Sequence, residues 1–99
     1  MAAKKIPPVH PGEILRLDFL VPLGMSQYRL AKATGIPQTR ISQIVKRRRA
    51  ITADTALRLG RFLGTSAELW MNLQARYDLD VARDEAGDRI EKKIIPYAA

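Results

Sequence analysis

The sequence predicts an all-α fold of five helices in one domain, and three observations support this class. Apolar residues recur at intervals of three and four along most of the 99-residue chain, which is the period of a helix buried on one face. Serine or threonine precedes several of these segments and glycine follows them, as at helix starts and ends. No segment alternates apolar and polar residues as a half-buried strand does.

The first helix is predicted to open within HPGEILRLDFL, residues 10–20. Pro11 suits a first turn, where a missing N–H has no partner to lose, and Glu13 is favourable at the positive end of the helix dipole. The helix is expected to stop at Pro22 and Gly24. Residues 1–9, with two lysines and two prolines, are interpreted as an extended N-terminal arm.

Two short helices are predicted in residues 26–45. Ser26 is a good N-cap for the earlier one, and Gly35 stands where a left-handed residue would end it. The later helix should begin at about Pro37. Its inner face is formed by apolar residues at positions i, i+3 and i+4: Ile41, Ile44 and Val45.

Thr52 is expected to cap a fourth helix that ends at Gly64, and TSAE at 65–68 has the capping-box pattern that starts a fifth. One apolar face of the fifth helix contains Leu69, Trp70, Leu73 and Tyr77. A second apolar stripe contains Met71, Ala75 and Leu79. We therefore predict an arm at 1–9, a helical domain at 10–82 and a charged C-terminal tail at 83–99 to which the sequence assigns no structure.

The charge of the chain favours a polyanionic partner. The formal net charge is +7, and it is unevenly placed, since residues 1–49 hold ten Lys and Arg against two Asp and Glu. A basic half of this kind is typical of nucleic-acid binding.

Composition also argues against several other classes of protein. Without cysteine and with only His10 as histidine, the chain offers neither a disulfide framework nor a His/Cys metal site, and we predict no metal and no cofactor. It has no nucleophile, metal cluster or paired acid that would make it an enzyme. No apolar run approaches a membrane span and no secretory signal is evident, so we expect a cytoplasmic protein with no membrane partner.

Residues 26–45 are best explained as two helices that cross steeply through a tight turn, a helix-turn-helix. Ala31 is small where the two helices would come closest, and Gly35 supplies the turn. The polar opening turn of the later helix is then free to enter the major groove of DNA.

The chain resembles the XRE family of helix-turn-helix regulators, and more closely the HigA antitoxins, also called VapI-like. The resemblance covers residues 10–79 and rests on HPGEIL, the helix pair, ITADTALRL and WMNLQARYDL in that order. It implies a lambda-repressor-like fold and a dimeric antitoxin that neutralises a HigB-like messenger-cleaving toxin and binds operator DNA to repress their shared promoter. The open alternative is a freestanding XRE-type transcriptional regulator without a toxin partner.

Within this motif, candidate base readers are the polar residues at the front of the later helix. Glutamine can bond adenine, arginine can bond guanine, and the threonine methyl can meet thymine. These candidates are Gln38, Thr39, Arg40 and Gln43. Arg40 is equally suited to phosphate.

Phosphate contacts are expected at the front of the earlier helix and in the basic run after the later one. The candidates are Ser26, Gln27, Lys46, Arg47, Arg48 and Arg49. Ser26 can serve both as a cap and as a phosphate contact. The run KRRR replaces the Asn-Gly-Lys type of turn often seen in relatives, and Lys4 and Lys5 either extend an arm over DNA or belong to a solvated terminus.

Other residues have simpler interpretations. His10 is expected to have a structural role in the first turn, and Trp70 and Tyr77 to belong to the core rather than to stack on bases. The acidic residues between 78 and 88 fit a solvated face or a patch that meets a basic toxin. The stripe Met71, Ala75 and Leu79 is the candidate interface of a homodimer.

Overall fold

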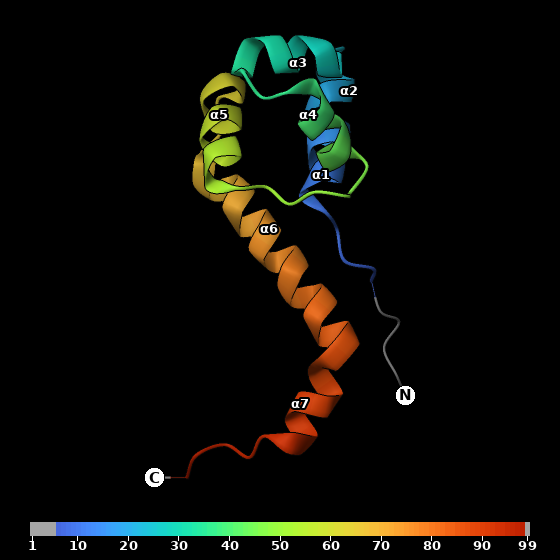
Figure 1. Ribbon diagram of the computed structural model, residues 1–99, viewed down its shortest axis with the longest axis vertical. Coiled ribbons are helices and arrows are strands. Elements are labelled where there is room, and N and C mark those ends of the chain that lie inside the picture. Colours follow the sequence, from blue (N-terminus) through green and yellow to red (C-terminus); the bar gives the residue numbers. More distant parts are fainter. Residues whose placement is uncertain (1–5, 99) are drawn as a thin grey trace.

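The computed structural model describes residues 6–98, and all of its regular secondary structure there is helical (Figure 1). Five helical units build the bundle, as the sequence predicts. The elements are α1 Pro11–Ile14, η1 Leu15–Leu20, α2 Val21–Leu23, α3 Gln27–Thr34, α4 Gln38–Val45, α5 Ala53–Leu63, α6 Ala67–Ala82, η2 Arg83–Gly87 and α7 Asp88–Lys93. Lys4 and Lys5 lie outside the described residues.

The first unit is one continuous helix made of α1, the wide π-helical turn η1 and α2. It ends at Gly24 as predicted, with a left-handed backbone at φ 59°. The N–H of Gly24 bonds to the Val21 carbonyl at 3.1 Å and that of Met25 to the Leu20 carbonyl at 2.9 Å, a Schellman closure. Pro22, expected to stop the helix, lies inside α2.

The wide turn explains how the helix accommodates this proline. Proline lacks an N–H and its ring collides with the carbonyl four residues earlier in a regular α-helix. Here the preceding N–H, of Val21, reaches back five residues to the Arg16 carbonyl. Such a turn widens the helix locally, which relieves the crowding in front of the ring.

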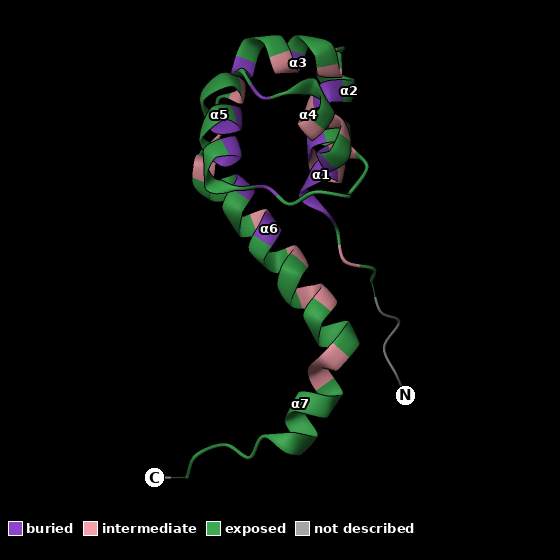
Figure 2. Ribbon diagram, in the orientation of Figure 1, coloured by how far each residue is buried: buried purple, intermediate pink, exposed green. Residues whose placement is uncertain are grey.

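The core lies between the five units and centres on Trp70 (Figure 2). Its ring is fully buried, lies 5.3 Å from the Phe19 ring between centroids, and donates its indole N–H to Thr65 Oγ1 at 2.8 Å. The prediction that Trp70 is a core residue is therefore confirmed. The other fully buried large apolar side chains are Leu15, Leu30, Ile41, Ile44 and Leu59.

Gly12 fixes the distance between the first helix and α4. A Cβ built on Gly12 would overlap the backbone carbonyl of Ile44, and it would also come within 3.1 Å of His10 Nδ1. Only a residue without a side chain permits this approach. The last turn of α4 therefore rests directly on the first turn of α1.

His10 connects three parts of the bundle. It is the N-cap of α1, where Nδ1 accepts the N–H of Gly12 at 2.9 Å. Its ring meets the edge of Tyr77 on α6 at 4.8 Å between centroids. Burial lowers the pKa of His10 and the charge of Arg47 lowers it further, while the charge of Asp78, a hydrogen bond to the Arg49 backbone and the charge of Glu13 partly offset both. The structural role predicted for His10 is confirmed.

The C-terminal part continues the helix of α6 away from the bundle (Figure 1). Residues 83–93, expected as a charged tail, are helical through η2 and α7, and Ile94 begins an extended segment at φ −103° and ψ 115°. All residues from Asp88 to Ala98 are exposed. In residues 6–98, no helix has the length and apolar character needed to cross a membrane.

We expect Gly12→Ala to destabilise the fold by about 1–3 kcal/mol, because the new methyl group must push α4 away from α1. Urea denaturation gives the free energy of unfolding. The matched control is Gly87→Ala, whose Cβ would meet Arg83 Cβ at an ordinary 3.7 Å within a helix. That variant should be unchanged or gain up to about 1 kcal/mol. Equal effects at the two sites would contradict the close approach.

We also expect stability to fall in mild acid through His10. Because its pKa is lowered in the folded state, the unfolded chain takes up the proton first. The contribution of neutral His10 to the free energy of unfolding is complete above the unfolded pKa of about 6.5. It is lost as the pH falls from there through the lower pKa of the folded state. Denaturation series between neutral pH and mild acid measure the slope. His10→Asn keeps a capping acceptor and should remove that slope; an unchanged slope would assign the effect elsewhere.

Candidate nucleic-acid interface

The turn between α3 and α4 is held by hydrogen bonds from both sides. Gly35 ends α3 with φ 76°, as predicted. Thr34 Oγ1 donates to the Leu30 carbonyl at 2.7 Å and accepts the N–H of Ile36 at 3.2 Å. Ile36 is buried beneath the turn, so the angle between the two helices is anchored to the core.

Arg58 on α5 holds this turn from its solvent side by a hydrogen bond. The sequence analysis did not predict this role. Arg58 Nη1 donates to the Thr34 carbonyl at 3.0 Å, and its Nε is held by Asp54 Oδ2 at 3.0 Å. A Cβ at Gly35 would come within 2.8 Å of the same Nη1. The only sequence signal was the spacing of Asp54 and Arg58, which predicts their pairing but not the contact with α3.

Helix α4 starts at Gln38 with Pro37 as N-cap. Gln38, Thr39 and Gln43 are exposed, whereas Arg40 is half-buried. Ile41 and Ile44 on the opposite side are fully buried. The helix therefore presents a polar, solvent-facing front and an anchored back, which is the arrangement required to enter a groove without unfolding.

The basic run after α4 forms a second Schellman closure. The N–H of Arg47 bonds to the Ile44 carbonyl at 2.9 Å and that of Arg48 to the Gln43 carbonyl at 2.8 Å. Arg47 occupies the left-handed position at φ 63°, the one non-glycine residue with positive φ in residues 6–98. This geometry favours glycine, so the departure from an Asn-Gly-Lys turn strains Arg47.

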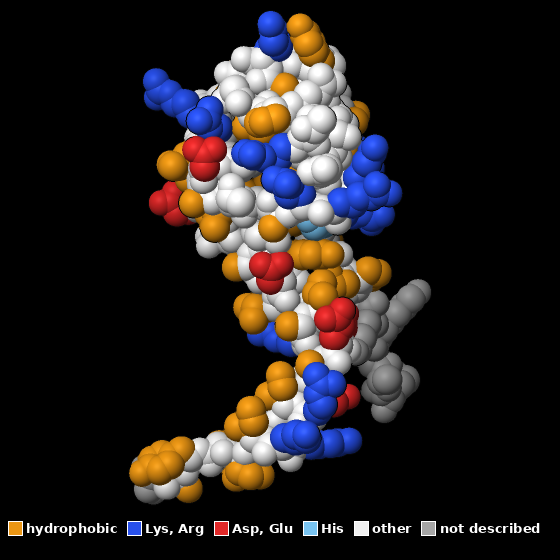
Figure 3. All heavy atoms as spheres, viewed as in Figure 1, with side chains coloured by type: hydrophobic (Ala, Val, Ile, Leu, Met, Phe, Trp, Pro, Cys, Tyr) orange, Lys and Arg blue, Asp and Glu red, His pale blue; other side chains and the backbone are white. Residues whose placement is uncertain are grey.

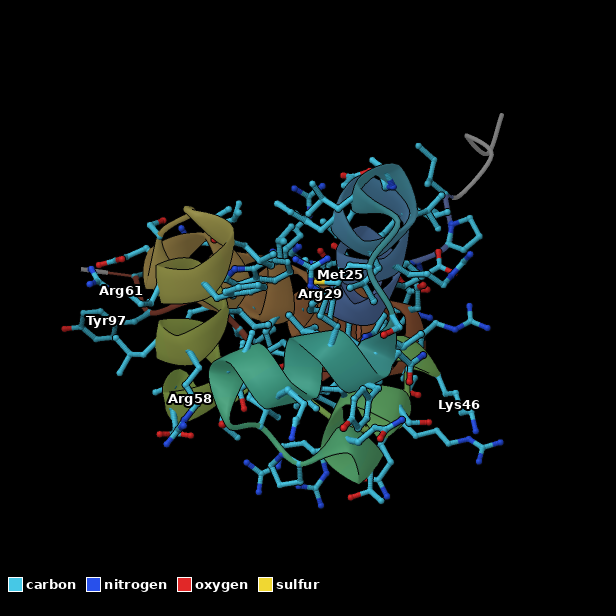
Figure 4. The ribbon with its side chains drawn as sticks, turned by 90° about the horizontal axis from the view of Figure 1, so that it is seen from above. Met25, Arg29, Lys46, Arg58, Arg61 and Tyr97 are labelled. Carbon is cyan, nitrogen blue, oxygen red and sulfur yellow. The ribbon has the colours of Figure 1, made fainter. Side chains whose placement is uncertain are left out.

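All four cations of this run are exposed, and the Arg47 guanidinium lies 3.7 Å from Glu13 of the first helix. Figure 3 shows Lys and Arg side chains gathered over the bundle, with a group at its right-hand edge. In Figure 4, Lys46 points outward at one side of the helix pair while Arg58 lies at the other, by α5. The run is thus placed to follow a phosphate backbone beside α4.

The front of α3 shows the cap that the sequence predicts. Ser26 Oγ accepts the N–H of Arg29 at 3.0 Å, and Gln27 is half-buried at the first helical position. Capping leaves the backbone N–H groups of the first turn directed outward from the helix end.

Gln74 is a second residue that sequence reasoning missed. It is buried on α6, where its Oε1 accepts the N–H of Ile51 at 2.8 Å and its Nε2 donates to Asp78 Oδ1 at 2.9 Å. The bond from Ile51 connects the loop between α4 and α5 to α6. The loop begins with the basic run, and Ile51 lies near its other end. A glutamine within an amphipathic helix gives no sequence signal for such a distant partner.

The remaining candidates are distributed over α6. Met71, Ala75 and Leu79 are all exposed, as an unpaired stripe requires. Tyr77 is half-buried against His10. Asp80 forms ion pairs with Arg76 at 3.1 Å and Arg83 at 3.5 Å, and no group in residues 6–98 has three or more His, Cys, Asp or Glu placed to hold a metal ion.

Comparison with known proteins agrees with this geometry. The family model described as Helix-turn-helix matches residues 18–70. Virulence-associated protein I of Dichelobacter nodosus is 49% identical over 82% of this chain and 75% of its own length. An addiction module antidote protein of the HigA family from Coxiella burnetii is 47% identical, with a TM-score of 0.88 over 93% of this chain and 100% of its own.

A further similar structure is that of the antitoxin HigA of Pseudomonas aeruginosa, solved with the higBA promoter. It is 45% identical and superimposes with a TM-score of 0.89 over 92% of this chain and 99% of its own. The similarity therefore extends over the bundle and most of the helix that leaves it.

We expect Arg47→Gly to stabilise the fold by about 1 kcal/mol, because glycine adopts the left-handed backbone without strain. The lost ion pair with Glu13 is exposed and contributes little. Thermal and urea unfolding measure the difference. The control is Arg48→Gly, which removes the same charge from an ordinary backbone and should gain nothing. A gain in both variants would show that reduced charge repulsion, not backbone strain, is the cause.

Proposed function

Because this chain belongs to the helix-turn-helix family and, within it, to the HigA antitoxins, we propose that it is the antitoxin of a type II toxin–antitoxin pair. In this proposal it binds operator DNA as a homodimer, represses its own promoter and neutralises a HigB-like RNase toxin. It acts in the cytoplasm, and its DNA-binding domain is residues 10–82.

The observation that carries the DNA-binding role is the orientation of α4. Its first turn exposes Gln38 and Thr39, with Gln43 one turn later, while Ile41 and Ile44 fix the other side to the core. Side chains that leave the front of such a helix reach base edges in the major groove. Arg40, half-buried beside them, serves as a further reader of bases or as a phosphate contact.

Phosphate contacts flank the reading helix on two sides. Lys46, Arg47, Arg48 and Arg49 supply cations at its end, and Ser26 and Gln27 supply helix-terminal N–H groups at the start of α3. These contacts add affinity and fix the register of α4, whereas the base contacts supply sequence preference.

A dimer follows from the size of the footprint. One reading helix contacts only a few base pairs, and a two-fold pair presents two helices to half-sites about 34 Å apart. The exposed stripe Met71, Ala75 and Leu79 offers an apolar surface for this pairing. The toxin is assigned to the acidic side of α6 and η2, which complements a basic RNase.

We expect Gln38→Ala or Gln43→Ala to weaken operator binding by roughly 1–3 kcal/mol and to change binding to scrambled DNA much less. Each variant removes hydrogen bonds to a base edge but no charge. Titrations of both duplexes at several salt concentrations, with helicity checked by circular dichroism, measure the effect.

The matched variant is Arg48→Ala, which removes a cation expected at phosphate. It should weaken binding to both duplexes and reduce the salt slope by about one. If the glutamine variants lose both duplexes equally, or the arginine variant loses only the operator, the assignment of base and phosphate contacts is wrong.

We expect the protein to co-purify with the toxin encoded beside it and to abolish the growth arrest that this toxin causes. Co-expression with and without the antitoxin measures rescue, and tagged pull-down measures the complex. A Gln38→Ala variant is the control, because it should lose operator preference and retain rescue. Operator binding without rescue or co-purification would favour the freestanding regulator.

A further inference from the structure

Helix α3 presents an exposed tyrosine and an exposed lysine side by side. Tyr28 is 58% exposed, and Lys32, one turn later on the same face, is exposed as well. The Lys32 ammonium lies 5.7 Å from the centroid of the Tyr28 ring, which is the geometry of a cation–π contact. Neither side chain belongs to the buried core of residues 6–98, so both can contact another molecule.

This pair lies on the flank of α3 that faces α4. Ala33, on the other flank, lines a groove together with residues of α5. Since successive residues of a helix are rotated by about 100°, the half-buried Ala31 lies on the flank opposite to Ala33, where α4 packs. Tyr28 and Lys32 follow Ala31 around the helix toward solvent. Figure 4 shows Arg29 on the side of α3 away from α4.

The charge of this region favours an anion as the ligand of the pair. Residues 19–53, which contain α3 and α4, hold seven Lys and Arg and no Asp or Glu. The phenol hydroxyl of Tyr28 can donate a hydrogen bond, and the ammonium of Lys32 supplies both donors and charge. Hydroxyl and ammonium groups placed together suit a phosphate oxygen.

The position of the pair also fits the backbone of DNA better than its bases. With the front of α4 in the major groove, a DNA backbone passes the start of α3, where Ser26 and Gln27 are the proposed phosphate contacts. Tyr28 belongs to the same helical turn and lies beside α4, not at its front. Its hydroxyl can therefore reach the phosphate track that borders the groove.

We propose that Tyr28 and Lys32 form a phosphate-binding site on α3 for the operator backbone. The Tyr28 hydroxyl donates to a phosphate oxygen, and Lys32 holds the ring in position and adds its charge. This inference rests on the proposed function, because it requires α4 to lie in the major groove, and it extends that function to two residues that were not among the sequence candidates. The site contributes affinity and register, and no base preference.

Tyr28→Phe tests the hydroxyl alone, because it keeps the ring and its contact with Lys32. Binding to operator and to scrambled duplex should both weaken at least about fivefold. The salt slope should not change, since no charge is lost, whereas Lys32→Met should lower it by about one. Titrations of both duplexes at several salt concentrations measure these effects, and urea denaturation checks that the fold is unchanged. Unaltered binding by Tyr28→Phe, or an unaltered salt slope for Lys32→Met, would overturn the proposal.

The matched control is Arg29→Gln, which removes a full positive charge from the adjacent position. Because Arg29 lies on the side of α3 away from α4, the operator affinity should change less than about twofold at physiological salt. A larger loss for Arg29→Gln than for Tyr28→Phe would mean that net charge, and not a placed donor, determines the affinity. That result would overturn the phosphate site.

Nitration of tyrosine by tetranitromethane, located by mass spectrometry, gives an independent measurement on the natural chain. Tyr28 and Tyr97 are both exposed, so both should react in the free protein. Operator duplex should suppress nitration of Tyr28 and leave that of Tyr97 unchanged. Equal nitration of Tyr28 with and without operator would contradict the contact.

These outcomes separate the site from the function on which it rests. A natural chain that does not bind operator contradicts the proposed function itself. Operator binding that is insensitive to Tyr28→Phe contradicts only the phosphate site. A Tyr28→Ala variant that binds operator normally but no longer co-purifies with the toxin would assign the pair to the protein partner and overturn the proposal.

Discussion

The contact between Gly12 and the Ile44 carbonyl is the constraint on which the rest of the structure depends. It brings the first helix against the last turn of α4 with no side chain between them. The same carbonyl accepts the N–H of Arg47, so the end of α4, the start of the basic run and the first helix meet at one point. The position of α4 is thus determined by this backbone contact together with the buried side chains of Ile41 and Ile44, so the exposed polar front of the helix need not contribute to stability.

Polar side chains complete this positioning. Gln74 bonds to the backbone of Ile51, the exposed Arg58 bonds to the end of α3, and His10 caps α1 and packs against Tyr77 on α6. Each contact connects a segment beside α4 to another part of the bundle. Since a buried polar group is costly unless it is paired, the bonds of the buried Gln74 and His10 favour one arrangement over alternatives. The segments proposed to meet DNA are consequently held in place before DNA is present.

At Arg47 the chain keeps a positively charged side chain at a backbone position where it costs fold stability. Glycine or asparagine would adopt its left-handed backbone at lower cost, yet neither carries a positive charge. Four consecutive cations beside α4 raise the electrostatic attraction to a polyanion. In the proposed interface the phosphate contact of Arg47 would offset this loss of fold stability, and the Schellman closure holds the residue in place.

The sequence by itself determined the helices of the bundle and the polar front of α4, because caps, glycine stops and apolar periods act over a few residues. It also placed Ser26, Gly35, Gly24 and Trp70 in the roles that the structure shows. Only the tertiary structure decided that Pro22 continues a helix, that residues 83–93 extend α6, and that Gln74 and Arg58 hold distant loops. The physical reason is the distance along the chain over which each interaction acts. These features depend on a widened turn or on partners more than twenty residues away, and a local sequence pattern does not reveal such partners.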